Sequence, residues 1–192
     1  MTALLDVTPT EIPDVLLLKT RRFGDDRGFL TEAFHRERWR DAGLPCDFCQ
    51  DNQALSTRRG TLRGLHFQRP PAAQTKVVRA TRGAIWDVAV DMRVGSPWYG
   101  FWVGHELSAA NGLQMLIPAG FAHGYVTLEP DSEASYKMDA PYAPNCEGGL
   151  RWDDPAVGIA WPIPADELII LDRDRALPPL AELPPAFRWS PR

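Results

Sequence analysis

Two histidines stand in segments whose glycine and proline spacing is unusual. His66 comes six residues after Gly60, and His123 ends a segment, residues 112–123, with the pattern G-x5-P-x-G-x-x-H. An imidazole titrates near neutral pH, so it can take up and return protons or, when neutral, bind a metal ion. Glycine and proline favour the tight turns between strands. The two segments therefore predict strands whose histidines can project into the interior of a barrel.

The segments around these histidines have the periodicity of strands. Within residues 84–93, Trp86 and Val88 alternate with Asp87 and Asp91, which predicts a strand with two unlike environments. Similar runs predict strands at residues 15–18, 28–34, 61–68, 76–81, 101–108, 114–117 and 124–128. The clearest helical pattern, residues 35–42, ends at a glycine. Prolines become frequent after residue 162 and predict short helical turns and loop. Many strands without alternating helices predict an all-β antiparallel sandwich or barrel.

Length and composition limit the class of protein. The chain has 192 residues, and we expect a single domain over residues 1–192. A net charge of −4 gives no general attraction to nucleic acid or to an anionic membrane. No apolar run reaches the roughly 18–20 residues that span a bilayer, and the first residues lack the pattern of a secretory signal. We therefore expect a cytoplasmic protein without nucleic-acid or membrane partners.

The three cysteines include one C-x-x-C pair, Cys46 and Cys49. A zinc ribbon needs a second pair, and only Cys146 remains. A thioredoxin-like redox site needs a βαβ context that this stretch lacks. We expect reduced thiols in a cytosolic protein.

The two histidine segments resemble the paired motifs of the cupin superfamily. This resemblance predicts an all-β cupin jelly-roll barrel with a few short peripheral helices. Metal-binding cupins use His-x-His, a glutamate and a later histidine, but here Gln68 and Lys76 replace the second histidine and the glutamate. An ammonium at that place repels a divalent cation, so we expect no metal. We interpret Lys76 as a fixed charge that faces a substrate oxygen; the alternative is a surface lysine at a strand end.

A longer series of motifs resembles the dTDP-4-dehydrorhamnose 3,5-epimerases over nearly the whole chain. The matching segments are residues 23–32, 50–52, 63–68, 87–93, 96–97, 118–124, 135–137 and 172–174. The resemblance implies an isomerase without a cofactor that inverts C3 and C5 of dTDP-4-dehydro-6-deoxy-D-glucose, a dTDP-4-keto-6-deoxy sugar, to give dTDP-4-dehydro-L-rhamnose. The ketone acidifies both protons because the carbanion left behind is an enolate. Inversion then needs a base, an acid on the other side and positive charge at the enolate oxygen.

The resemblance implies a role for each residue of this chemistry. His66 corresponds to the base, and Asp174 to the carboxylate that holds its ring. Tyr136 corresponds to the acid that returns a proton from the opposite face. Lys76 and His123 correspond to the groups beside the ketone oxygen. A structural role remains the alternative for each: a satisfied core histidine, or a tyrosine that lines the barrel.

The resemblance also implies how the nucleotide is bound. The implied binding residues, besides His123, are Arg27, Glu32, Gln50, Asp51, Asn52, Arg63, Tyr142, Glu147 and Arg173. Arg63 and Arg173 would bind the pyrophosphate, although several relatives carry lysine in place of Arg173. Tyr142 would stack on the thymine ring. Arg27 and Glu32 would reach the site of a neighbouring subunit, which implies a homodimer.

Three other functions compete with double epimerisation. Relatives that invert only C3 or only C5 use the same His–Tyr–Asp set, and pocket shape decides between these outcomes. We favour the double epimerase because it is the commoner activity. A sugar-binding cupin without catalysis would tolerate loss of the acid or the base, yet both are present. A metal oxygenase is disfavoured by Gln68 and Lys76.

Overall fold

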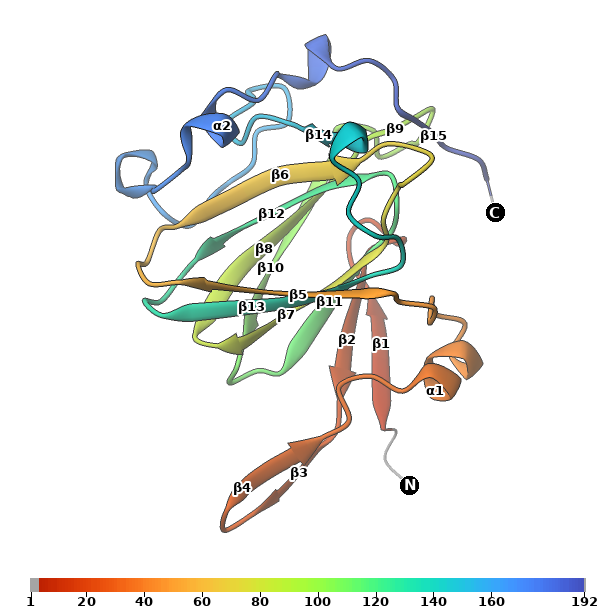
Figure 1. The fold of residues 1–192 in the computed structure, drawn as a ribbon, viewed down its shortest axis with the longest axis vertical. Coiled ribbons are helices and arrows are strands. Elements are labelled where there is room, and N and C mark those ends of the chain that lie inside the picture. Colours follow the sequence, from red (N-terminus) through yellow and green to blue (C-terminus); the bar gives the residue numbers. More distant parts are fainter. Residues whose placement is uncertain (1–3, 192) are drawn as a thin grey trace.

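Most strands belong to two antiparallel sheets that face each other (Figure 1). The computed structural model describes residues 4–191. The six-stranded sheet has the order β1 (Leu5–Pro9), β2 (Leu16–Thr20), β11 (Leu113–Ile117), β7 (Lys76–Arg82), β13 (Ser132–Met138) and β5 (Gln50–Ser56). The five-stranded sheet has the order β10 (Trp102–Ser108), β8 (Ala84–Asp91), β12 (Phe121–Thr127), β6 (Leu62–Gln68) and β14 (Glu147–Gly149). This arrangement confirms the all-β prediction.

The space between the sheets holds the main core. Val78, Ile85, Met115 and Phe121 are almost fully buried there and come from both sheets. Their side chains alternate with outward ones along each strand, as a two-sided sheet requires. The predicted strand at residues 114–117 confirms this pattern as β11, one residue longer at its start.

The boundaries of four predicted strands were wrong by two or three residues. The run at residues 15–18 is β2, which extends to Thr20, and the run at residues 124–128 is β12, which begins at Phe121. The run at residues 28–34 ends as β4 at Thr31, and the run at residues 84–93 ends as β8 at Asp91. The two faces of β8 do differ, but both are buried, because Asp87 and Asp91 have no exposed surface. Strands β5 and β13 were not predicted, because polar residues lie on both of their faces and the alternation of apolar and polar residues is lost.

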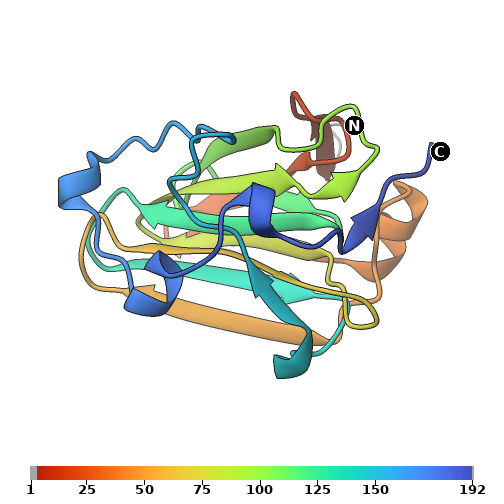
Figure 2. The same ribbon diagram turned by 90° about the horizontal axis from the view of Figure 1, so that it is seen from above.

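Apart from β14, the last quarter of the chain, residues 144–191, covers the outer face of the five-stranded sheet (Figure 2). It consists of loop, three 3-10 turns, Pro144–Cys146, Ala165–Glu167 and Leu180–Glu182, helix α2 (Asp172–Arg175), and β15 (Phe187–Arg188), which pairs in parallel with β9 (Arg93–Val94). Its apolar side chains, such as Ile163 and Leu168, pack on Leu62 of β6. The expected short turns and loop are confirmed. Burial of this face explains why the outward residues of β6 and β12, such as Leu65 and Val126, are apolar.

Two elements near the N-terminus lie outside the barrel. Helix α1 (Arg36–Asp41) confirms the predicted helix, begins after the N-cap His35, and buries Trp39 against the six-stranded sheet. The hairpin of β3 (Arg22–Asp25) and β4 (Gly28–Thr31) projects away from the barrel (Figure 1), with Leu30 74% exposed. No helix within residues 4–191 has the length and apolar character to cross a membrane.

Candidate active site

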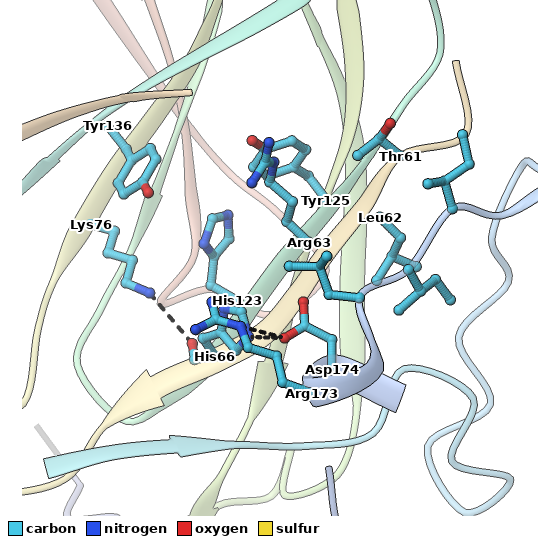
Figure 3. A pocket seen from close by; sticks show the side chains of 13 residues that line it. Thr61, Leu62, Arg63, His66, Lys76, His123, Tyr125, Tyr136, Arg173 and Asp174 are labelled. Carbon is cyan, nitrogen blue, oxygen red and sulfur yellow. Dashed lines mark hydrogen bonds and ion pairs between the residues drawn. The ribbon is translucent and has the colours of Figure 1, made fainter. Parts of the chain in front are cut away.

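A cavity of about 250 Å³ opens between the two sheets and brings distant segments together (Figure 3). Its walls are formed by Thr61, Leu62, Arg63, His66, Lys76, His123, Tyr125, Tyr136, Ile169, Ile170, Leu171, Arg173 and Asp174. These residues come from four barrel strands and from the C-terminal tail. Seven of the predicted site residues therefore share one cavity: His66, Tyr136, Asp174, Lys76, His123, Arg63 and Arg173.

A β-bulge places both Arg63 and His66 inside the barrel. Residues three apart on a regular strand point to opposite faces. On β6, however, His66 pairs with His123 and Arg63 pairs with Tyr125, so three steps on β6 match two on β12. The extra residue restores the inward direction. The same register makes His66 and His123 direct cross-strand neighbours.

Gly64 allows this bulge because β6 and β12 approach each other closely there. Its φ is +122°, which side-chain-bearing residues rarely adopt. A Cβ at this position would lie 2.6 Å from the Cα of Gly124. Gly64 also donates its amide hydrogen to Asp174 Oδ2 at 3.3 Å. The glycine thus joins the strand to the carboxylate of the site.

His66 and Asp174 form a hydrogen-bonded pair. His66 Nε2 lies 2.9 Å from Asp174 Oδ1, and the aspartate is almost completely buried. Burial raises the pKa of Asp174, but the bonds from His66 and Gly64, together with the charge of Arg173, outweigh it and lower that pKa below the usual value. The carboxylate is therefore ionised at neutral pH and can stabilise a protonated imidazole.

Lys76 places its ammonium group inside the barrel, as predicted. Its Nζ lies 3.4 Å from the carbonyl oxygen of His66 (Figure 3). Burial lowers the pKa of Lys76 to about 8, although Asp87 and Glu147 oppose this effect. The group is still mostly charged at pH 7. A partly desolvated cation of this kind interacts strongly with a developing negative charge.

Asp87 was missed by the sequence analysis as a site residue. It is fully buried on β8, and its Oδ1 lies 2.8 Å from His123 Nε2. Burial raises the pKa of Asp87 and lowers the pKa of His123. Asp87 thus fixes the orientation of the His123 ring, the second imidazole in the cavity. The signal that could have found it was an acidic residue in the middle of a strand that is apolar apart from Asp91 at its end.

Tyr136 faces His66 from the other sheet. It lies on β13, whereas His66 lies on β6, and Figure 3 shows both side chains directed to the same space. The cavity also contains Tyr125, which the sequence analysis did not single out. A base and a hydroxyl on opposite walls can act on opposite faces of a flat intermediate.

Four other predicted residues form a hydrogen-bonded cluster away from the cavity wall. Gln50 Oε1 accepts from the backbone amide of Tyr142 at 2.8 Å, and Gln50 Nε2 donates to Asn52 Oδ1 at 3.0 Å. Tyr142 Oη donates to Glu147 Oε2 at 2.8 Å. Tyr142 is 54% exposed, so its ring is free to stack on a ligand. We call these four residues the rim cluster.

Three predicted residues are not brought to the cavity of their own chain. Asp51 pairs with Lys137 at 2.9 Å on the outer face of the six-stranded sheet, because it alternates with the inward Asn52. Arg27 pairs with Asp25 in the projecting hairpin, and Glu32 follows that hairpin and contacts the guanidinium of Arg38 at 2.7 Å.

Gln68 and the cysteines have no part in the cavity wall. The Gln68 amide donates to the carbonyl of Ala72 at 2.7 Å, and its oxygen accepts from the amide of Ala143 at 2.7 Å. It therefore holds two loops together. Cys46, Cys49 and Cys146 are free thiols. Within residues 4–191, no group of three or more His, Cys, Asp or Glu side chains is placed to hold a metal ion.

Comparison with known proteins places this chain in a family. A sequence profile described as dTDP-4-dehydrorhamnose 3,5-epimerase matches residues 9–182. The dTDP-4-dehydrorhamnose 3,5-epimerase of Sinorhizobium fredii is 51% identical over 183 residues, which cover 93% of this chain and 91% of that protein.

Solved structures agree with this assignment. The dTDP-6-deoxy-D-glucose-3,5-epimerase of Legionella pneumophila in complex with dTDP-4-keto-L-rhamnose matches with a TM-score of 0.92 at 35% identity, over 97% of this chain and 100% of that one. A 3'-monoepimerase from Streptomyces bikiniensis in complex with dTDP-quinovose matches with a TM-score of 0.82 at 35% identity, over 90% and 87%. The likeness confirms the expected cupin jelly-roll barrel. The chain therefore belongs to the dTDP-4-dehydrorhamnose 3,5-epimerases, a family of isomerases.

Proposed function

We propose that this protein inverts C3 and C5 of dTDP-4-dehydro-6-deoxy-D-glucose to give dTDP-4-dehydro-L-rhamnose, through an enolate and with its own side chains. The observation that carries the proposal is the cavity in which His66, bonded to Asp174, faces Tyr136 with Lys76 between the two sheets. These groups supply the base, the acid and the positive charge that the reaction requires.

His66 takes the proton from the carbon next to the ketone. The imidazole becomes positively charged in this step, and the ionised Asp174 at 2.9 Å stabilises that charge and holds the ring in place. Because the aspartate is buried, water competes poorly for the same hydrogen bond. The electrons of the broken C–H bond move to the ketone oxygen and form the enolate.

Lys76 and His123 stabilise the enolate oxygen. The ammonium contributes a full charge. His123 donates from its other ring nitrogen when the buried Asp87, whose pKa is raised, is protonated and donates to His123 Nε2. Such groups are already oriented before the negative charge develops, so they need no reorganisation during the reaction. Tyr136 then returns a proton to the opposite face of the carbon, which inverts its configuration.

The nucleotide lies outside the inner cavity in this proposal. The cavity volume of about 250 Å³ is below the roughly 300–1,000 Å³ of pockets that enclose a whole ligand. The sugar therefore occupies the cavity, and the nucleoside diphosphate extends over its edge. Arg63 and Arg173 stand at the cavity and bind the pyrophosphate. Tyr142 of the rim cluster stacks on the thymine ring.

The proposal includes a homodimer, a single domain and a cytosolic location. The projecting hairpin exposes Phe29 and Leu30 and carries Arg27, an arrangement that suits contact with a second copy of the chain. The C-terminal tail packs on the barrel over a shared core, which supports one domain over residues 1–192. Free cysteines suit a reducing compartment.

The test is proton exchange in D₂O, followed by NMR at each sugar carbon. We expect wild-type protein to introduce deuterium at C3 and C5 of dTDP-4-keto-6-deoxyglucose. His66→Asn should abolish exchange at both carbons, whereas His35→Asn, which removes an imidazole outside the cavity and retains a good N-cap, should not. Retained exchange at both carbons in His66→Asn would refute the assignment of the base.

The same experiment identifies the acid and the regiochemistry. Tyr136→Phe should slow inversion while leaving some exchange, because removal and return of the proton use different groups. Normal turnover in this variant would refute the role of Tyr136. Deuterium at only one carbon in the wild type would instead establish a mono-epimerase, the second candidate that the match to the Streptomyces bikiniensis protein keeps open.

A further inference from the structure

Tyr125 carries a buried hydroxyl group that the proposed reaction does not use. It lies on β12, two residues after His123 and four after Phe121, so all three side chains point into the barrel. Tyr125 is 3% exposed, and its ring lines the cavity (Figure 3). Its Oη has no partner of good hydrogen-bond geometry among the residues that the structure describes, although Ser56 lies near enough to lower its pKa slightly.

The polar neighbours of this hydroxyl are engaged elsewhere. Arg63 directs its Nε to the hydroxyl of Ser56 at 3.2 Å and its Nη2 to the carbonyl of Leu55 at 3.2 Å. Burial raises the pKa of Tyr125 to about 12, with smaller opposing effects from Arg63 and Ser56. The phenol is therefore protonated at neutral pH and has a hydrogen to donate.

A buried hydroxyl without a partner destabilises a protein, so phenylalanine would be favoured at this position if only packing mattered. Because Tyr125 lines the cavity, a ligand bound there can supply the missing partner. We propose that Tyr125 is a specificity-determining residue that donates a hydrogen bond to an oxygen of the bound sugar nucleotide, either a sugar hydroxyl or a phosphate oxygen. This inference rests on the proposed function of the cavity.

The hydroxyl binds and orients the substrate rather than moving a proton. Tyr136 already stands opposite the base. A phenol whose pKa is raised by burial is also a weaker acid than an ordinary tyrosine. The expected effect of losing the group is therefore on substrate affinity, with a smaller effect on kcat.

The test is Tyr125→Phe, which removes one oxygen and preserves the ring. We expect KM for the sugar nucleotide to rise about 3- to 10-fold, as for loss of one neutral hydrogen bond, with deuterium exchange at C3 and C5 retained. The midpoint of thermal unfolding should stay the same or rise, because an unpaired buried group is removed. Tyr99→Phe, the same change at a surface tyrosine outside the cavity, should alter neither quantity.

Binding of dTDP alone distinguishes the two kinds of oxygen. If Tyr125→Phe weakens dTDP binding as much as it raises KM, the partner is a phosphate oxygen; if dTDP binding is unchanged, the partner is on the sugar. An unchanged KM overturns the inference, and an unchanged KM with a lower unfolding midpoint shows that the hydroxyl has a structural partner such as Ser56. Failure of wild-type protein to bind or convert the sugar nucleotide would instead reject the proposed function.

Discussion

Replacing Lys76 with methionine should change stability and activity in opposite directions. Burial lowers the pKa of Lys76 from the usual 10.5 to about 8, even though Asp87 and Glu147 attract its charge. At 1.36 kcal/mol for each pKa unit, holding the charged form in the folded protein costs about 3 kcal/mol. Methionine has a similar shape and no charge. The variant should therefore be more stable at pH 7 by up to about 3 kcal/mol, since the attraction of the two carboxylates is already included in the pKa of about 8.

Activity should fall because the same charge stabilises the enolate oxygen. Loss of one such group raises the barrier by about 3–4 kcal/mol, so kcat for Lys76→Met should decrease about 10²- to 10³-fold. Wild-type kcat should itself decrease above pH 8, where Lys76 loses its proton. The lysine would then be a group that the fold retains for function at the expense of stability.

The pH dependence of stability provides a second check. Between about pH 8 and 10.5 the folded wild type has released the Lys76 proton while the unfolded chain still holds it. The unfolded state binds more protons, so the free energy of unfolding of the wild type rises with pH relative to that of the variant. The advantage of Lys76→Met should therefore shrink steadily from pH 8 to pH 10.

Urea unfolding at several pH values measures this difference directly. Lys19→Met is the matched control, because Lys19 is exposed on β2 and its replacement should change the free energy of unfolding by no more than about 0.5 kcal/mol. If Lys76→Met proved less stable than the wild type at pH 7, with a difference independent of pH, the ammonium would be solvated and the reasoning refuted.

Three further predictions concern the remaining parts of the site. Asp174→Asn should lower kcat about 10²- to 10⁴-fold in steady-state assays. Because the pKa of Asp174 is lowered in the folded state, the stability that it contributes should decrease as the pH falls below about 4, and an unfolding difference that does not change from pH 6 to pH 3 would contradict this. Gly64→Ala should reduce the free energy of unfolding by about 1–3 kcal/mol more than Gly28→Ala, since both have positive φ but only Gly64 meets neighbouring backbone; equal losses in urea unfolding would argue against the close approach. Replacing Phe29 and Leu30 with serine should convert a dimer into a monomer in light scattering, whereas an unchanged mass would remove the hairpin from the interface.

Much of the fold could be predicted because β-strands leave a local signal. Alternation at residues 114–117 and the turn glycines predicted strands that the structure contains, and the C-cap glycine predicted the end of α1. Strands β5 and β13 were not predicted because polar residues lie on both of their faces, and outward ones such as Asp51 and Lys137 find their partners only across strands. Cross-strand pairing is a property of the register, and one strand read alone does not contain it.

The amino-acid sequence by itself determined which chemical groups are available: two imidazoles, a lysine in place of a carboxylate, a tyrosine and a tail aspartate. Only the tertiary structure decided which of them meet. The bulge at Gly64 turns both Arg63 and His66 inward, and burial of Asp87 makes it the partner of His123. The face of the sheet to which a side chain points, and how deeply it is buried, depend on contacts between residues far apart in the chain. Distance, desolvation and therefore the pKa of Lys76 arise from those contacts and not from local sequence.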